Sequence, residues 1–472
     1  MELSPEQQVA LTAFQRGENL FVTGPGGTGK TKLIERMVEH ATTANLSYQV
    51  CALTGCAATL LSQARTIHSW SGIKLARGPK AQVVDGALRN RKAAASWRKT
   101  RILIVDEVSM MSAKMFDILE QLARAARKSP APFGGMQVVF VGDFYQLPPV
   151  GGEDPEDDQF AFESTRWSVV FPAPNHVELH TIFRQTDPLY KAILMQVRQG
   201  TLSAEHAAVL QARVRPYDQD ANTVQPTKLF PTRARTDFLN KSMYEKLEGK
   251  EYVFPCDLRS NCTTYIETNK AIPPLLLSRS QSLSSDEKDR EFQQLVAANA
   301  SGSELRLKQG AVVMCTVNLP SSGLCNGSQG VVVGFSASKD TVPGSPIVRF
   351  TNGMTVTMNM QYRQSDEYPT LAVGHVPLML AWALTIHKIQ GTTLSQAEMD
   401  VGGLVFECGQ TYVALSRVQS LDGLYLSAFD PKRITVNPKV RAFYATLAAA
   451  AAAKTPKQEE EIGNVFTKVV TL

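Results

Sequence analysis

The chain has 472 residues, more than a single hydrophobic core usually supports, so two to four domains are expected. Apolar residues make up 43% of the chain and charged residues 20%, which is ordinary for a globular protein. No apolar run reaches the ~18 residues of a membrane span. The N-terminal MELSPEQQ lacks the basic and apolar regions of a signal peptide. We therefore expect an intracellular protein without a membrane partner.

The seven cysteines form no CxxC pair, so neither a zinc site nor a disulfide framework is expected. The net charge of +5 is unevenly spread. Nine Lys and Arg residues fall between positions 74 and 101, whereas 153–158 reads EDPEDD. A basic segment of this kind can contact phosphates, and a solvated helix face is an equal alternative.

Short apolar runs in the first third of the chain predict buried strands, and helical patterns lie between them. The strands are expected at 20–23, 48–53, 102–105 and 137–141, and the helices at 30–41 and 113–127. This alternation predicts a parallel sheet covered on both faces over residues 1–175.

A second region begins near residue 176 with helical patterns at 188–199 and 204–214. Short strands separated by turns at 305–360 predict a small β-barrel, and the Ser-rich stretch 276–304 predicts a surface loop with one short helix. The α/β character returns at 376–430. From about 448, an alanine run predicts a fraying helix and a tail.

The sequence GPGGTGKT at 24–31 fits GxxxxGK[ST] between a predicted strand and a predicted helix, the context that a phosphate-binding loop needs. Glycines let backbone N–H groups turn toward phosphates, Lys30 adds a positive charge, and the Thr31 hydroxyl can bind Mg²⁺. ATP and Mg²⁺ are therefore the expected cofactors. The expected contacts are Gly24, Gly26, Gly27, Thr28, Gly29, Lys30 and Thr31.

The strand ILIVDE at 102–107 ends in two carboxylates, roughly 75 residues after this loop. Asp106 is expected to hold Mg²⁺, and Glu107 to polarise the attacking water as a general base. In GDFYQLPPV at 142–150, Gln146 could bond the γ-phosphate and the lytic water. A proline-stiffened loop is the alternative interpretation.

Two arginines are candidates for sensing the γ-phosphate. Arg184 in IFRQ and Arg417 in VALSRV lie far from the phosphate loop in the sequence. Phosphoryl transfer needs positive charge on the γ-phosphate oxygens, which either guanidinium could deliver. An exposed surface role is the ordinary alternative for an arginine.

Two stretches have the residue types of a single-stranded nucleic-acid track. TIHSWSGI at 66–73 interleaves His68 and Trp70 with small polar residues, which suits base stacking. A core position is an equal alternative for Trp70. LTIHKIQGTT at 384–393 carries Thr385, His387 and Lys388. A core histidine is the alternative for His387.

These motifs together resemble the Pif (petite integration frequency) helicases of superfamily 1, which move 5′ to 3′. GPGGTGKT, DEVSM and GDFYQLPPV are similar to motifs I to III, and LHTIFRQ, PLMLAWALTIHKIQGTTL and GQTYVALSRVQSLDGL to motifs IV to VI. DILEQLARAAR, followed by PFGGMQ, resembles the family's signature element. The resemblance runs from residue 3 to about 430.

The resemblance assigns further site residues. LSPEQ at 3–7 resembles the Q motif, which implies that Gln7 reads adenine. Gly391 joins Gln146 and the two arginines at the γ-phosphate. Further DNA contacts carry over to Thr54, Gly55 and Asn318. At Val317 the chain departs from the family, in which lysine is more usual.

The fold that the resemblance implies is α/β, with two RecA-like P-loop domains. Domain 1A is expected at 1–175, with a wedge insertion, 1B, at about 74–98. Domain 2A is expected at 176–275 and 376–446, an SH3-like β-barrel insertion, 2B, at 276–375, and a tail at 447–472.

The leading hypothesis is a monomeric, ATP-dependent 5′-to-3′ DNA helicase that acts on single-stranded and forked duplex DNA. The family suggests roles in DNA replication, repair and recombination, and G-quadruplex DNA and RNA–DNA hybrids as further substrates. An ATP-gated single-strand-binding remodeller and the motor subunit of a recombination nuclease are the alternatives. RNA as the track stays open, as do nucleus, mitochondrion and viral replication site as the place of action.

Overall fold

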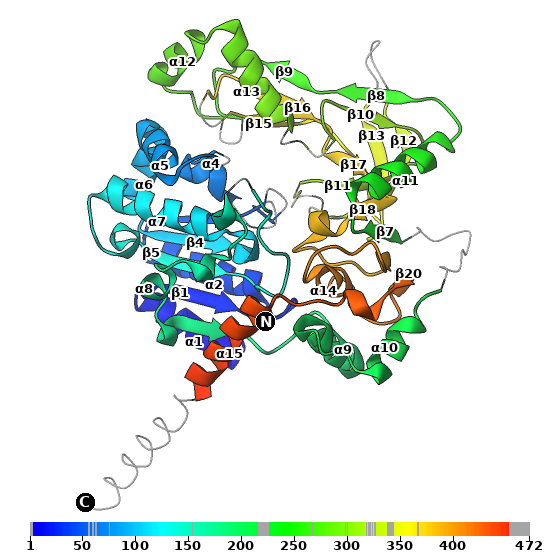
Figure 1. Cartoon of the computed structure of the whole chain (residues 1–472). Coiled ribbons are helices and arrows are strands. Elements are labelled where there is room, and N and C mark those ends of the chain that lie inside the picture. The colour runs from blue at the N-terminus through cyan, green and yellow to red at the C-terminus, as the bar shows by residue number, and fades with distance from the viewer. Residues whose placement is uncertain are drawn as a thin grey trace, which may run out of the picture. The chain divides into compact units, whose positions relative to one another are not determined.

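A computed structural model describes most of the chain as far as residue 452 (Figure 1). The described residues are 3–54, 57–58, 61, 64–74, 76–152, 154–215, 226–266, 269–297, 299, 301–317, 319, 322, 324, 327–337, 344–365 and 368–452. They form two compact units. The first unit is 1–214 with 401–424 and 428–472, and the second unit is 215–400 with 425–427.

The first unit is built on a six-stranded sheet in which all neighbouring strands are parallel. Its order is β3 (Arg65–Thr66), β2 (Tyr48–Ala52), β4 (Ile102–Asp106), β5 (Gln137–Val141), β1 (Leu20–Thr23) and β6 (His176–Glu178). The expected strands form to within a residue at each end. The sheet also continues through β6, past the boundary expected at 175.

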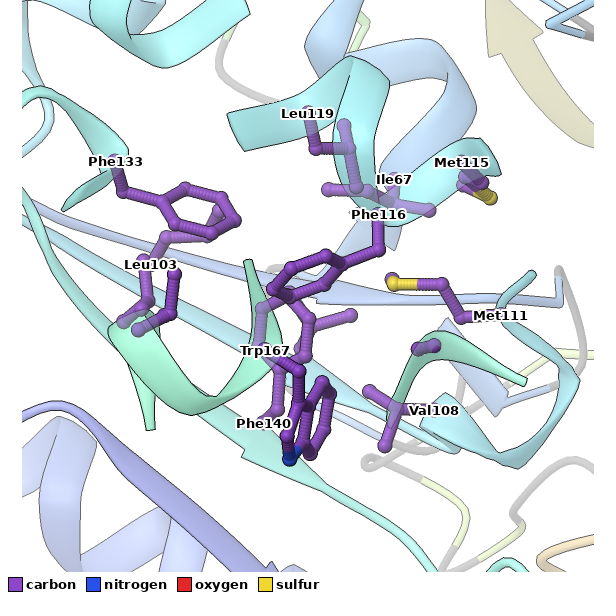
Figure 2. Close-up of a cluster of buried hydrophobic side chains, with 14 of the residues drawn as sticks. Ile67, Leu103, Val108, Met111, Met115, Phe116, Leu119, Phe133, Phe140 and Trp167 are labelled. Atoms are coloured by element: carbon purple, nitrogen blue, oxygen red, sulfur yellow. The ribbon is translucent and has the colours of Figure 1, made fainter. Parts of the chain in front are cut away.

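Both faces of this sheet are covered, and its central strands β4, β5 and β1 are accordingly almost continuous apolar runs. Along β1, Leu20 and Val22 face the cluster made with α1 (Pro5–Gln15) and α2 (Lys30–Thr43), whereas Phe21 faces the opposite cluster. Phe116 of α7 (Ala113–Arg127) lies at the centre of that opposite cluster (Figure 2).

The opposite cluster holds the stretch expected as a wedge. The stretch expected as a wedge forms α5 (Lys80–Arg89) and α6 (Arg91–Lys99), which pack on α7 near α4 (Ile67–Ser71) (Figure 1). Lys80 lies 2.7 Å from a carboxylate oxygen of Asp117 and 2.5 Å from one of Glu156. Part of the basic segment is therefore neutralised by the acidic segment at 153–158.

The remaining helices of the first unit are α8 (Trp167–Val170), α9 (Pro188–Gln199), α10 (Ala204–Gln211), α14 (Gln410–Leu415) and α15 (Pro438–Ala452). The sequence divides α15 between a second domain and a tail. In the structure, Val440, Tyr444 and Leu447 of α15 are buried in the same cluster as Phe116. Their spacing places them on one helix face, but the alanine run conceals that pattern.

The second unit contains three larger sheets. One has the order β18 (Ala383–Thr385), β7 (Thr227–Phe230), β19 (Ala397–Val401) and β20 (Leu424–Phe429), with α11 (Arg233–Glu245) against β18 and β7. An antiparallel sheet in the expected β-rich region has the order β14 (Thr355–Thr357), β13 (Pro346–Phe350), β12 (Gln329–Phe335), β11 (Val312–Cys315) and β17 (Leu378–Leu380). The third is β15 (Gln361–Gln364), β16 (Ala372–His375) and β9 (Asp257–Arg259).

The stretch 276–304 differs from the single-helix loop that the sequence predicts. It contains most of α12 (Pro274–Gln281), all of α13 (Ser285–Ala297) and the start of β10 (Glu304–Leu307), which pairs with β8 (Tyr252–Pro255). A capping box explains α13. The Glu287 N–H donates to the Ser284 hydroxyl, and the Ser284 N–H donates to the Glu287 carboxylate. The pattern SSDE carries this signal, which the Ser-rich composition hides.

Within the described residues, no helix combines the length and the hydropathy that crossing a bilayer requires.

Phe116→Ala should lower the free energy of unfolding of the first unit by about 3–5 kcal/mol, because the fully buried ring packs on Phe133, Phe140 and Trp167. Thermal and urea denaturation measure the loss. The matched control is Val9→Ala on α1, where the side chain is 61% exposed and a change within about 0.5 kcal/mol is expected. Equal losses in the two variants would contradict the placement of the core.

Candidate nucleotide and nucleic-acid sites

The phosphate-binding loop joins β1 to α2 at the carboxyl edge of the first sheet, and two of its glycines leave no room for a side chain. Gly24 has a φ of +142°, and a Cβ there would lie 2.4 Å from the Leu179 carbonyl oxygen. Gly27 has a φ of +87°, and its Cβ would lie 2.6 Å from the Cβ of Arg184. The segment 179–184 therefore lies directly against the loop.

Lys30 and the two threonines occupy the end of the loop. The Lys30 ammonium donates to the carbonyls of Gly24 and Pro25, at 2.7 and 2.9 Å. Burial lowers the pKa of Lys30, against the opposing effect of three carboxylates, those of Asp143, Glu107 and Asp106. Thr31 is exposed in the first turn of α2, and the buried Thr28 donates to the Pro25 carbonyl at 2.9 Å.

The two expected catalytic carboxylates stand at the end of β4. Burial raises the pKa of Asp106 to about 7, and the charge of Glu107 adds to the shift. Asp106 accepts a hydrogen bond from the Glu107 N–H at 2.8 Å, and Glu107 has a positive φ of 56°. A buried carboxylate with too little positive charge around it is a suitable Mg²⁺ ligand, because Mg²⁺ prefers oxygen donors and binds through few carboxylates plus phosphates. The Thr31 hydroxyl is the second candidate ligand.

Gln146 follows β5 and is 4% exposed. Its N–H donates to the Asp143 carbonyl at 2.8 Å, which closes a tight turn after the strand. A Cβ at Gly409, the residue before α14, would lie 2.6 Å from the Gln146 carbonyl oxygen. The start of α14 therefore packs closely on the turn that carries Gln146.

The two candidate sensor arginines lie near one another, Arg417 buried and Arg184 half-buried. Burial lowers the pKa of Arg184 to about 9, and the charge of Arg417 contributes to the shift. Burial also lowers the pKa of Arg417, which is 2% exposed. The Arg184 guanidinium donates to the Ser416 carbonyl at 2.9 Å, and that of Arg417 donates to the Val413 carbonyl at 2.9 Å. Two desolvated cations, one of which packs against Gly27 of the phosphate loop, make a site suited to a polyanion.

Two residues missed by the sequence analysis contact the phosphate loop from α14. The Tyr412 hydroxyl accepts a hydrogen bond from the Gly26 N–H at 2.8 Å. A Cβ at Gly26 would lie 3.4 Å from Ser416. Both residues fall within GQTYVALSR, so the motif contained the signal, although only Arg417 was singled out.

The side chain of Gln7 is hydrogen-bonded both to the start of α1 and to the phosphate loop. Its amide oxygen accepts from the Ser4 N–H at 2.9 Å, and its NH₂ group donates to the Thr28 and Gly29 carbonyls at 3.0 and 3.2 Å. Both ends of the amide are therefore committed to α1 and the phosphate loop. Beside them, Phe183 is 38% exposed and lies 3.5 Å from the position that a Cβ of Gly29 would take.

The first stretch of the expected nucleic-acid track needs a correction. Trp70 is 3% exposed and packs on Trp97 with ring centroids 4.5 Å apart, so the buried alternative holds and its face is closed to bases. His68 is partly exposed, and burial lowers its pKa. The Thr54 hydroxyl accepts from the Ala57 N–H at 3.1 Å, in the turn after β2. Gly55 lies outside the described residues.

The second stretch lies in the second unit. Thr385 and Lys388 line a pocket of about 390 Å³ together with Arg233 of α11. Within the described ranges, neither Lys388 nor Arg233 has an ion-pair partner. Burial lowers the pKa of His387, and Gly391 has a φ of +87°. Asn318 lies outside the described residues.

Comparison with known proteins gives two family matches. Residues 2–206 match the PIF1-like helicase family, and residues 291–335 match the 2B domain of the DNA helicase Pif1. The human ATP-dependent DNA helicase PIF1 is 34% identical, over 94% of this chain and 64% of the relative. The ATP-dependent DNA helicase Pif1 of Bdellovibrio bacteriovorus is 33% identical, over 94% of this chain and 92% of the relative.

Solved structures agree with these matches. The crystal structure of the Pif1 helicase from Candida albicans has a TM-score of 0.77 and 30% identity, over 95% of this chain and 100% of that chain. A Bacteroides Pif1 helicase in complex with ADP-AlF3 and ssDNA has a TM-score of 0.64 and 27% identity, over 96% and 98% of the two chains.

The parallel first sheet, with its phosphate loop at the carboxyl edge, defines a P-loop protein, and the solved neighbours give it two RecA-like domains. Within that class, the chain belongs to the PIF1-like helicase family. It spans slightly under two thirds of the animal relatives that it matches, such as 64% of the human protein.

Gly27→Ala should weaken MgATP binding by roughly tenfold or more, because a Cβ there would collide with the Cβ of Arg184, which cannot rotate away. Titration with a fluorescent ATP analogue measures the dissociation constant. Gly17→Ala is the matched control, since its φ of +81° imposes similar strain but nothing lies within 4 Å of the added Cβ. Equal losses in both variants would assign the effect to backbone strain alone.

Proposed function

We propose that the chain is an ATP-dependent DNA helicase that moves 5′ to 3′ along single-stranded DNA and unwinds duplex or forked DNA. The observation that carries the proposal is the placement of three cations at the phosphate loop: Lys30 donates to two loop carbonyls, Arg184 packs against Gly27, and Arg417 follows Ser416, whose carbonyl accepts from Arg184. Because desolvation lowers the pKa of each cation, a triphosphate bound at the loop would stabilise their charged forms.

In the proposed site, Lys30 and the loop N–H groups bind the β- and γ-phosphates, and Glu107 takes the proton of the attacking water. Thr31 and Asp106 hold Mg²⁺, which neutralises phosphate charge when bound. Arg184 and Arg417 stabilise the charge on the γ-phosphate oxygens, Gln146 orients the water, and Gly391 approaches the γ-phosphate. Gln7 supports the loop, and the exposed ring of Phe183 offers a face for adenine.

Coupling to movement needs a part of the chain that belongs to both units. Arg417 is followed within ten residues by Tyr425 of β20, a strand of the sheet that contains β7 and β18. A change in the bonding of Arg417 during hydrolysis therefore has a short covalent route into the second unit. Net motion follows if the two units hold the strand with different strength in each nucleotide state.

The domain division inferred from the sequence belongs to the same proposal, with 1A at 1–175, 1B at 74–98, 2A at 176–275 and 376–446, and 2B at 276–375. Because β6 pairs with β1, we propose that 1A extends to Glu178. Because α15 is buried in the core of the first unit, we also assign the last part of the expected 2A, from Pro438 to residue 446, to 1A. We further propose DNA replication, repair or recombination, inside a cell, as the setting. The relatives named DNA helicases and the Bacteroides structure with ssDNA support this.

The decisive assay uses duplexes with a single-stranded 5′ or 3′ tail. The wild-type chain should separate the 5′-tailed duplex with ATP, and Lys30→Ala should abolish both separation and DNA-stimulated ATP hydrolysis while retaining single-strand binding. Lys32→Ala is the control, because Lys32 is exposed and pairs with Glu35 on the surface of α2. ATP-dependent release of single strands without separation of any duplex would favour the ATP-gated remodeller instead.

The pocket of the second unit generates a salt-dependence prediction. If Lys388 contacts a backbone phosphate, Lys388→Gln should reduce the slope of log K against log salt by about 0.7 for single-stranded DNA. Fluorescence anisotropy with an oligothymidine measures the slope. Lys246→Gln is the control, an exposed lysine at the end of α11 that does not line the pocket, and should leave the slope unchanged. An unchanged slope for Lys388→Gln would remove the pocket from the DNA path.

A further inference from the structure

Three neighbouring strands of the first sheet are joined just beyond their carboxyl ends by a buried polar network. Arg198 of α9 donates two hydrogen bonds to the Asp143 carboxylate after β5, at 3.0 and 2.9 Å. It also lies 3.7 Å from Glu178, at the end of β6. Asp143 is fully buried and Arg198 is 2% exposed. None of these three residues was singled out from the sequence.

Tyr444 of α15 extends the network to β1, the strand that lies between β5 and β6. Its hydroxyl lies 2.5 Å from the Thr23 hydroxyl at the end of β1. It accepts from the Phe144 N–H at 3.2 Å and donates to the Asp143 carboxylate at 3.2 Å. A phenol has one proton to donate and two lone pairs, so these three contacts use its full capacity if Thr23 donates.

The charges in the network favour this arrangement. Burial raises the pKa of Tyr444, and the negative charge of Asp143 raises it further, so the phenol stays a neutral donor. Burial opposes the charged form of Arg198, but Asp143 outweighs it and the pKa of Arg198 is raised. The Arg198 guanidinium also lies over the rings of Tyr145 and Tyr444, at 4.5 and 5.1 Å from their centroids.

The network borders the proposed ATP site on two sides. Thr23 directly precedes Gly24, the first residue of the phosphate loop. The Asp143 carbonyl accepts from the Gln146 N–H, so Asp143 shapes the turn that presents Gln146. The charges of Asp143 and Arg198 also act on the pKa of Lys30.

We propose that the hydroxyl of Tyr444 is a positioning group of the ATP site. It links Thr23 to Asp143 and so fixes the distance between the phosphate loop and the turn that carries Gln146. A helix more than 400 residues away in sequence from the phosphate loop thereby sets the geometry of hydrolysis. The inference rests on the proposed function, because its kinetic effect requires that the site hydrolyse ATP.

Tyr444→Phe tests the proposal, because the variant keeps the ring that packs on Tyr145 and removes only the hydroxyl. Displacement of a water-orienting group by a fraction of an ångström should lower kcat for DNA-stimulated ATP hydrolysis by roughly tenfold to a hundredfold, with a smaller change in KM for ATP. Single-strand affinity should stay unchanged. Thr23→Val added to Tyr444→Phe should cost little more than Tyr444→Phe alone, since both remove the same contact.

The matched control is Val440→Ala, which thins the same buried face of α15 without a polar contact to the network. Assays run well below both melting temperatures should find its kcat near the wild-type value. Equal kcat losses in Val440→Ala and Tyr444→Phe, or a wild-type kcat in Tyr444→Phe, would overturn the positioning role.

Hydrogen–deuterium exchange separates this inference from the proposed function. Tyr444→Phe should exchange faster than Val440→Ala in peptides covering 23–30 and 142–147, whether or not the protein hydrolyses ATP. If the wild-type protein hydrolysed no ATP, the proposed function would be wrong, whereas the exchange result could still support the role of Tyr444. Unchanged exchange in both peptides would defeat the role of Tyr444.

Discussion

Desolvation of cations and carboxylates beside the phosphate loop is the constraint on which the nucleotide site depends. Arg417 is buried, Lys30 and Arg184 are half-buried, and desolvation lowers the pKa of each. The same desolvation raises the pKa of Asp106 to about 7. Both shifts act against the charged forms, so the site gains most from a ligand that brings phosphates to the cations and a metal ion to the carboxylate. MgATP has that charge pattern.

Close backbone packing places these charges. Because Gly24 and Gly27 lack side chains, the segment 179–184 lies against the phosphate loop. That contact places Arg184 at the loop. Gly409 plays the same part for α14, which lies against the Gln146 turn and carries Tyr412 toward the loop. Glycine therefore matters here beyond its freedom to take positive φ, since it lets three segments share one small volume. Charge and packing are linked, because the arginines are desolvated only when the segments that carry them pack this closely.

Local patterns predicted a large part of this molecule. The central strands β4, β5 and β1 of the first sheet are nearly continuous apolar runs, and the phosphate loop lies between a strand and a helix as its motif requires. Trp70 and Gln7 were harder to assign, because a ring beside polar residues suits both stacking and burial, and the position of Trp97 decides between them. The partners of the Gln7 amide are backbone carbonyls, which no sequence pattern marks.

The contribution of α15 illustrates why the remaining features escaped prediction. Its buried face is marked by Val440, Tyr444 and Leu447, but the alanines after them weaken the periodic signal. Its partners are a threonine before the phosphate loop and an aspartate after β5, and such polar residues are ordinary at strand ends. Parallel strands bring their carboxyl ends to one edge whatever their distance in the sequence. A long-range network at that edge is therefore a consequence of topology, and it becomes visible only when the strand order β5, β1, β6 is known.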